Sequence, residues 1–150
     1  MPSTDTPETP AFPLLGLDVS DRRIGVAIAE SADAPSSPLF TLQRTSRARD
    51  LGRCVEWVQR YDIRGVVIGL PLNMDGSTGP RAEAVTRFAE ELRTRIAVPV
   101  WLHDERLSTV EADELLAAQG MSAAERKERL DAVAAALILQ RFLHESQERL

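Results

Sequence analysis

The sequence lacks several features that would place it in other classes of protein. It has one cysteine, Cys54, so no disulfide can form within the chain. The helical spacing of the apolar residues around Cys54 predicts that its thiol packs in the core. No apolar stretch approaches the length of a membrane span, and the first residues lack the basic start and apolar run of a signal peptide. We therefore expect a cytoplasmic protein.

Aromatic residues and positive net charge are also scarce. Aromatics make up 5% of the chain, which leaves no evident stacking platform of the kind that single-strand-binding proteins use. The net charge of −5 argues against nonspecific coating of nucleic acid. It conceals a local excess of positive charge between Arg44 and Arg64, where six arginines stand against three acids. Nearly all basic residues are arginines, which would suit bidentate phosphate contacts, although genomic base composition explains this bias equally well.

The length and composition predict one compact domain. A chain of 150 residues with 43% hydrophobic residues is long enough for one core and too short for two. Residues 1–11 are rich in proline and threonine, and we interpret them as a disordered tail. The folded domain then comprises residues 12–150.

Apolar patterning predicts an α/β fold. Short apolar runs predict strands, and residues with helical periodicity predict helices. The expected strands are 13–19, 23–29, a shorter and more exposed 38–43, 65–70 and 99–102; the expected helices are 46–61, 80–96, 109–119 with a Ser108–Glu111 capping box, and 130 to the mid-140s after a charged connector, 125–129. The first strands must pair antiparallel and the later ones parallel, which predicts a mixed five-stranded sheet flanked by helices. Right-handed crossovers would place the first strand, with Asp18, at the centre.

Three acids stand in apolar settings. Asp18 lies inside the run Leu14–Val19, Glu105 follows the strand at 99–102, and Asp131 opens an apolar helix and shares its inward face. Buried carboxylates are costly unless they are paired, hydrogen-bonded or bound to a cation, so these placements suggest a cation site. Structural alternatives are an ion pair of Asp18 with Arg22 or Arg23, and stabilisation of Asp131 by a helix dipole in the first helical turn.

The segment from His103 to Arg106 stands where parallel strands usually present ligand sites. Adjacent acids point to opposite sides of an extended chain, so Asp104 and Glu105 cannot both face one site, and spacing alone does not choose between them. Zinc is disfavoured because neither histidine has a suitably spaced partner. Three carboxylates without thiol or histidine favour one or two hard cations, Mg²⁺ or Mn²⁺, of the kind that serve phosphoryl transfer.

The loop 71–80 should border this site, because it follows a parallel strand and precedes a helix whose free amide groups could hold a phosphate. Asn73 and Arg81 are the candidates for substrate contact. Arg106 has two open interpretations, a substrate contact or an ion pair with a neighbouring acid.

Four segments resemble the YqgF/RuvX family of bacterial proteins and occur in the same order. They are LLGLDVSDRRIGVAIAE (14–30), VVIGLPLNMDGSTGPRA (66–82), HDERLSTVEADELL (103–116) and LDAVAAALILQRFL (130–143). The strings at 70–76 and 104–109 are the most specific. The resemblance covers the whole chain except the N-terminal tail. It implies a ribonuclease H-like fold related to that of RuvC-type Holliday junction resolvases.

The resemblance also implies a function and a set of residues. It implies a metal-dependent nuclease that processes the 5′ end of pre-16S ribosomal RNA, with Holliday junction resolution as the older proposal. The acidic triad of the family maps onto Asp18, Glu105 and Asp131, and so selects Glu105 over Asp104. Arg22 and Arg23 match the basic pair of the family. Ser20-Asp21 departs from the family pattern, which puts the phosphate contact of that turn in doubt.

Of two other classes of function, one is kept as an alternative and the other is excluded. A noncatalytic nucleic-acid-binding module for ribosome assembly would bind substrate without turnover. A phosphotransferase of the sugar-kinase kind fails on length, because such enzymes bind nucleotide between two domains of this type. Paired cuts in a DNA junction would favour a homodimer, whereas RNA trimming could be done by a monomer.

Overall fold

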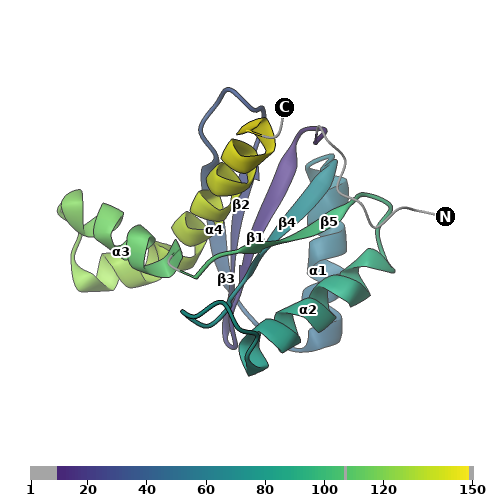
Figure 1. Cartoon of the computed structure of the whole chain (residues 1–150), viewed down its shortest axis with the longest axis horizontal. Helices are drawn as coiled ribbons and strands as arrows, with labels where there is room; N and C mark the ends of the chain where they lie inside the picture. The colour runs from purple at the N-terminus through teal and green to yellow at the C-terminus, as the bar shows by residue number, and fades with distance from the viewer. Residues whose placement is uncertain (1–9, 107, 149–150) are drawn as a thin grey trace.

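The computed structural model describes residues 10–106 and 108–148, so most of the expected tail at 1–11 lies outside the described residues. Five strands and four helices make up the described chain (Figure 1). The strands are β1 (Leu14–Val19), β2 (Arg23–Ala29), β3 (Ser37–Gln43), β4 (Gly65–Leu70) and β5 (Val100–Asp104); the helices are α1 (Arg47–Arg60), α2 (Pro80–Arg93), α3 (Ser108–Ala118) and α4 (Ala123–Glu148). None of the described helices is long and apolar enough to cross a membrane.

The strands form one mixed sheet in the order β3-β2-β1-β4-β5. β1 pairs antiparallel with β2 and parallel with β4, and β5 extends the parallel part. This confirms the predicted mixed sheet and places Asp18 in the central strand. Because β1, β4 and β5 run in the same direction, their carboxyl ends meet at one edge of the sheet.

Helices cover both faces of the sheet. Because successive side chains of β1 point to opposite faces, their positions in the strand determine which helix each contacts. Leu15 and Leu17 pack with residues of α1 and α2, including Cys54, in one apolar cluster. Leu14 packs on the opposite face with residues of α4. Figure 1 shows α1 and α2 together on one side of the sheet, with α4 across it and α3 beside α4. Asp18 has the same parity as Leu14 and therefore faces α4.

Glycines in the sheet allow α4 to approach closely. A Cβ atom on Gly16 would lie 2.9 Å from the carbonyl oxygen of Ala135, and one on Gly25 would lie 2.0 Å from that of Asp131. Gly25 is the cross-strand partner of Asp18. The missing side chain therefore brings the backbone of Asp131 against the sheet next to Asp18, so packing and site geometry depend on the same residue.

We expect Gly25→Ala to destabilise the protein by at least about 3 kcal/mol, because the new methyl group collides with backbone that cannot move without displacing α4. Gly52 is the matched control. It lies in α1 with no atom within 4 Å of its Cβ position, so Gly52→Ala should stabilise by about 0.5 to 1 kcal/mol. Urea unfolding of both variants measures the difference, and equal effects would contradict the close packing of α4.

The last helix differs from expectation. The predicted connector at 125–129 is wrong, because α4 already begins at Ala123. Ser122 Oγ accepts a hydrogen bond from the Glu125 amide, and Glu125 Oε1 accepts one from the Ser122 amide. This is a capping box, and it starts the helix two turns before the apolar stretch. Asp131 thus lies in the helix interior, which removes the interpretation of it as a first-turn acid.

Smaller differences concern the other boundaries. β5 continues to Asp104, two residues beyond the predicted strand. β3 is as exposed as expected, although at seven residues it is no shorter than β2. The burial of Cys54 confirms its predicted place in the core. The side chain of Ser108 lies outside the described set, and with it the expected capping box of α3.

Candidate active site

A cleft of about 580 Å³ lies at the carboxyl ends of β1 and β5, between α4 and the loop that precedes α2. It contains all three predicted acids together with three of the four residues predicted to contact substrate. Its charged and polar lining consists of Asp18, Ser20, Arg23, Asn73, Arg81, Glu105, Arg106, Thr109 and Asp131. Residues that are far apart in the sequence thus meet at the edge where parallel strands end.

Asp18 lines this cleft and is 4% exposed. Burial, together with the negative charge of Asp131, raises the pKa of its carboxyl group from 3.8 to about 7, although the charge of Arg81 opposes both effects. Within the described residues, its carboxylate has no hydrogen-bond or ion-pair partner. The alternative of an ion pair with Arg22 or Arg23 is therefore wrong, and the charge of Arg81 offsets only part of the cost of burying this carboxylate.

Glu105 is the acid of the 103–106 segment that faces the cleft. Trp101 packs against α4 and the ring of His103 stacks edge-on against Phe142, so the parity of β5 carries Glu105 toward the same helix. A Cβ atom on Gly69 would lie 2.6 Å from Glu105 Cγ, so this glycine makes room for the side chain. Burial, together with the negative charge of Asp18, raises the pKa of Glu105 from 4.5 to about 8, although the charge of Arg81 opposes this rise.

Asp104 turns away from the cleft and forms an ion pair with Arg106 at 2.9 Å. Arg106 also donates a hydrogen bond to the carbonyl oxygen of Met74, at 3.1 Å, in the loop 71–79. Of the two interpretations left open for Arg106, the pairing with a neighbouring acid is therefore present. Through these two contacts, Arg106 connects the loop to Asp104 at the end of β5.

Asp131 differs from the other two acids because it has a basic partner. Arg23 Nε donates to Asp131 Oδ2 at 2.7 Å, across 108 positions of sequence. Arg23 was predicted to contact substrate, and in the structure its guanidinium also forms this ion pair with Asp131. Its side chain remains 35% exposed and lines the cleft, so part of the guanidinium is open to solvent.

The donor set of the cleft fits a hard cation in its chemistry. Three carboxylates and no thiol or imidazole line it, and two of the carboxylates lack a basic partner among the described residues. Among those residues, no three acidic, histidine or cysteine side chains stand close enough to form a finished metal cluster. Mutual repulsion of the acids and the ion pair of Asp131 with Arg23 both oppose a closer approach of the carboxylates.

The loop 71–79 and the start of α2 close one side of the cleft. Gly79 is the N-cap of α2 and provides no side-chain hydrogen bond, and Pro80 occupies the first turn. Free backbone amides at such a helix start attract anions. Asn73 and Arg81 both line the cleft here, and Asn73 Nδ2 donates to Ser77 Oγ at 2.9 Å. Arg22 is exposed and does not line the cleft, so the structure separates it from the other predicted contacts.

Comparison with solved structures assigns the fold. The chain superposes on "T. thermophilus RuvC in complex with Holliday junction substrate" with a TM-score of 0.59 at 14% identity, covering 91% of this chain and 96% of that one. The Fowlpox virus resolvase bound to Holliday junction DNA gives a TM-score of 0.54 at 7% identity, covering 89% of this chain and 98% of the resolvase. At these identities the likeness concerns the fold alone, which is the ribonuclease H-like fold of resolvases.

Sequence comparison then identifies the family. Residues 13–145 match the family model described as "RuvX: Holliday junction resolvase". A relative from Thermoanaerobacter pseudethanolicus is 39% identical over 91% of this chain and 99% of its own length, and one from Anaeromyxobacter sp. is 46% identical over 86% and 94%. Both are provisionally named pre-16S rRNA nucleases. The chain belongs to the RuvX family of nucleases, as its sequence motifs predicted.

Proposed function

We propose that residues 12–150 form a metal-dependent nuclease that hydrolyses phosphodiester bonds at this cleft. The observation that carries the proposal is the burial of Asp18 beside two further acids, without a partner of its own in the described chain, in a cleft that also contains arginines. Such an arrangement is costly for folding and useful for binding a cation and a phosphate together.

Asp18, Glu105 and Asp131 would hold one or two Mg²⁺ or Mn²⁺ ions. A divalent cation supplies Lewis-acid activation of water and stabilisation of charge on the leaving oxygen. Arg81 and the uncapped start of α2 would bind the nonbridging phosphate oxygens. Arg23 would position Asp131, and Asn73 and Arg22 would contact the substrate within and outside the cleft, respectively.

We propose the 5′ end of pre-16S ribosomal RNA as the substrate, because relatives that match nearly the whole chain carry that name. From this proposed substrate we infer a cytoplasmic location. The second candidate is a Holliday junction, which the family description and the resolvase structures favour. A homodimer would suit paired cuts in a junction, whereas RNA trimming needs only a monomer.

One experiment separates these candidates. The purified protein is assayed on a ribosomal RNA precursor and on a synthetic four-way DNA junction, each with manganese, magnesium or a chelator. We expect cleavage of the RNA precursor with either metal and none with chelator. Faster cutting of the junction would favour the resolvase, and binding of both substrates without any cleavage would support the noncatalytic alternative.

A further inference from the structure

A second, smaller cavity lies next to the candidate active site, on the opposite face of the sheet. Its volume is about 110 Å³, enough for a few water molecules or one phosphate group, since water occupies about 30 Å³ in the liquid. Its charged and polar lining consists of Ser20, Asp21, Arg44, Arg47, Arg81 and Arg87. We call this cavity the arginine groove.

The arginine groove and the acidic cleft adjoin each other at the end of β1. Ser20 and Arg81 line both of them. Asp18 faces the cleft on the α4 side, whereas Val19, the next residue, packs in the cluster on the α2 side and lines the groove. The turn at Ser20 is therefore the ridge between the two cavities, and Arg81 stands beside it at the start of α2.

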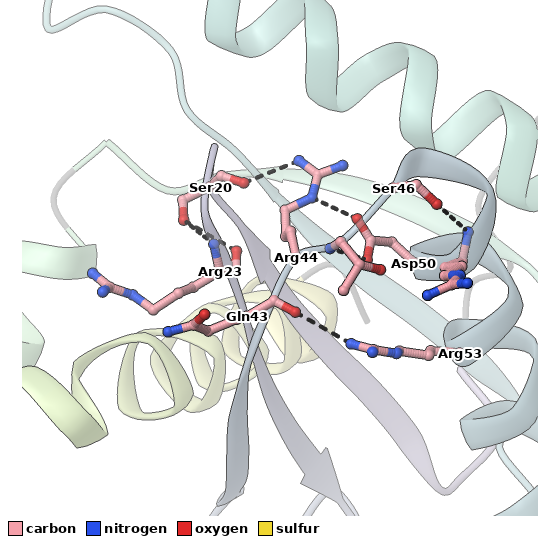
Figure 2. A network of polar contacts seen from close by, with 9 residues as sticks. Ser20, Arg23, Gln43, Arg44, Ser46, Asp50 and Arg53 are labelled. Carbon is pink, nitrogen blue, oxygen red and sulfur yellow. Dashed lines mark hydrogen bonds and ion pairs between the residues drawn. The ribbon is translucent and has the colours of Figure 1, made fainter.

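Arg44 is held in place before any ligand arrives. Its Nε donates to Asp50 Oδ2 at 2.9 Å and its Nη1 donates to the carbonyl oxygen of Ser20 at 3.0 Å, as Figure 2 shows. Asp50 is 1% exposed and also accepts a hydrogen bond from the Thr45 amide. The guanidinium lies 5.6 Å from the centre of the Phe88 ring. A guanidinium has five N–H donors, so these contacts fix Arg44 and leave donors for a ligand.

The remaining charges make the arginine groove attractive to an anion. Arg81 and Arg87 are exposed and have no ion-pair partner among the residues that the structure describes. Arg47 pairs with Glu91, which does not line the groove. Asp21 is the only acid in the described lining. Arginines therefore outnumber acids in this lining, and guanidinium groups are suited to bidentate phosphate contacts.

We propose that the arginine groove binds a backbone phosphate of the substrate strand, close along the strand to the phosphodiester bond held in the acidic cleft. The strand passes over the turn at Ser20, from the α4 side of β1 to the α2 side, with Arg81 contacting it at the crossing. This inference rests on the proposed function for its substrate. Because phosphate contacts position a strand without reading bases, the groove sets the register of cutting and not the sequence.

The test compares Arg87→Gln with the control Arg95→Gln. Arg95 is exposed just beyond α2 and lines neither cavity. Binding to one RNA and one DNA oligonucleotide is measured with chelator present, over a range of salt concentrations. We expect Arg87→Gln to weaken binding on every sequence and to lower the salt slope by roughly 1, and the control to match the wild type. An unchanged slope for Arg87→Gln, with its melting temperature intact, would overturn the proposal.

Phosphate neutralisation supplies a second readout. Single methylphosphonates are placed along the oligonucleotide, and binding is measured for the wild type and Arg87→Gln. A methylphosphonate at one position should weaken binding by the wild type and have no further effect on binding by Arg87→Gln. If each methylphosphonate weakened binding equally in both proteins, the proposed phosphate contact in the groove would be refuted. Because chelator prevents metal-dependent cleavage, these results are independent of whether the protein is a nuclease, which the RNA and junction assay decides.

Discussion

Asp18→Asn should abolish cleavage and, without divalent cation, make the protein more stable. Asparagine has nearly the same shape as aspartate and carries no charge, so it cannot replace a carboxylate that binds a cation. Loss of a contact to a metal ligand already costs about 10-fold to 100-fold, so loss of a ligand should exceed about 100-fold in cleavage rate. Cleavage of labelled RNA by matched amounts of folded protein measures this.

The gain in stability has an electrostatic cause. Above pH 7 the folded protein must keep Asp18 ionised in a buried position, where its pKa is raised to about 7. The substitution removes that cost, which corresponds to roughly 2 to 4 kcal/mol at pH 8. Near pH 4 the carboxyl group is protonated in the folded chain, so the gain should nearly vanish. Urea unfolding in chelator at the two pH values tests this.

Asp50→Asn is the matched control, because Asp50 is equally buried but forms an ion pair with Arg44 at 2.9 Å. Removing its charge leaves Arg44 without its partner, so this variant should lose about 1 to 3 kcal/mol. The same substitution at two buried aspartates therefore has opposite signs. A loss of stability at both positions would mean that Asp18 is a structural acid.

The sheet could be predicted from the sequence because its strands combine continuous apolar runs with short turns. β2 and β4 begin and end at the predicted residues, and the central position of β1 follows from crossover handedness. The start of α4 was missed for the opposite reason. Its first turns are polar and look like a connector, and only the reciprocal Ser122–Glu125 cap marks them as helix.

The candidate site was predictable in part. The place of Asp18 follows from strand burial, and Glu105 could have been separated from Asp104 by its parity with Trp101, a buried aromatic four positions earlier. The pairing of Arg23 with Asp131 could not be foreseen, because it joins residues that only the approach of α4 to Gly25 brings together. The arginine groove likewise depends on the packing of α2 beside the turn at Ser20.

The metal-free protein should lose stability as the pH rises from about 4 to about 8. Folding raises the pKa of Asp18 from 3.8 to about 7 and that of Glu105 from 4.5 to about 8. Between the unfolded and folded values, the folded chain holds protons that the unfolded chain has released. Stability therefore falls as the pH increases through this window, by up to about 1.4 kcal/mol per pH unit for each group.

Magnesium or manganese should reverse this trend, because a cation binds the deprotonated carboxylates and must displace their protons. The increase in melting temperature on adding either metal should be small at pH 5 and large at pH 8. A concentration of metal one hundred times its dissociation constant contributes about 2.7 kcal/mol. In Asp18→Asn both the pH slope in chelator and the response to metal should shrink. Two results would contradict this interpretation of the carboxyl groups as a cation site that destabilises the metal-free protein. One is a wild-type melting temperature that rises steadily to pH 8 in chelator, and the other is an equal response to metal at both pH values.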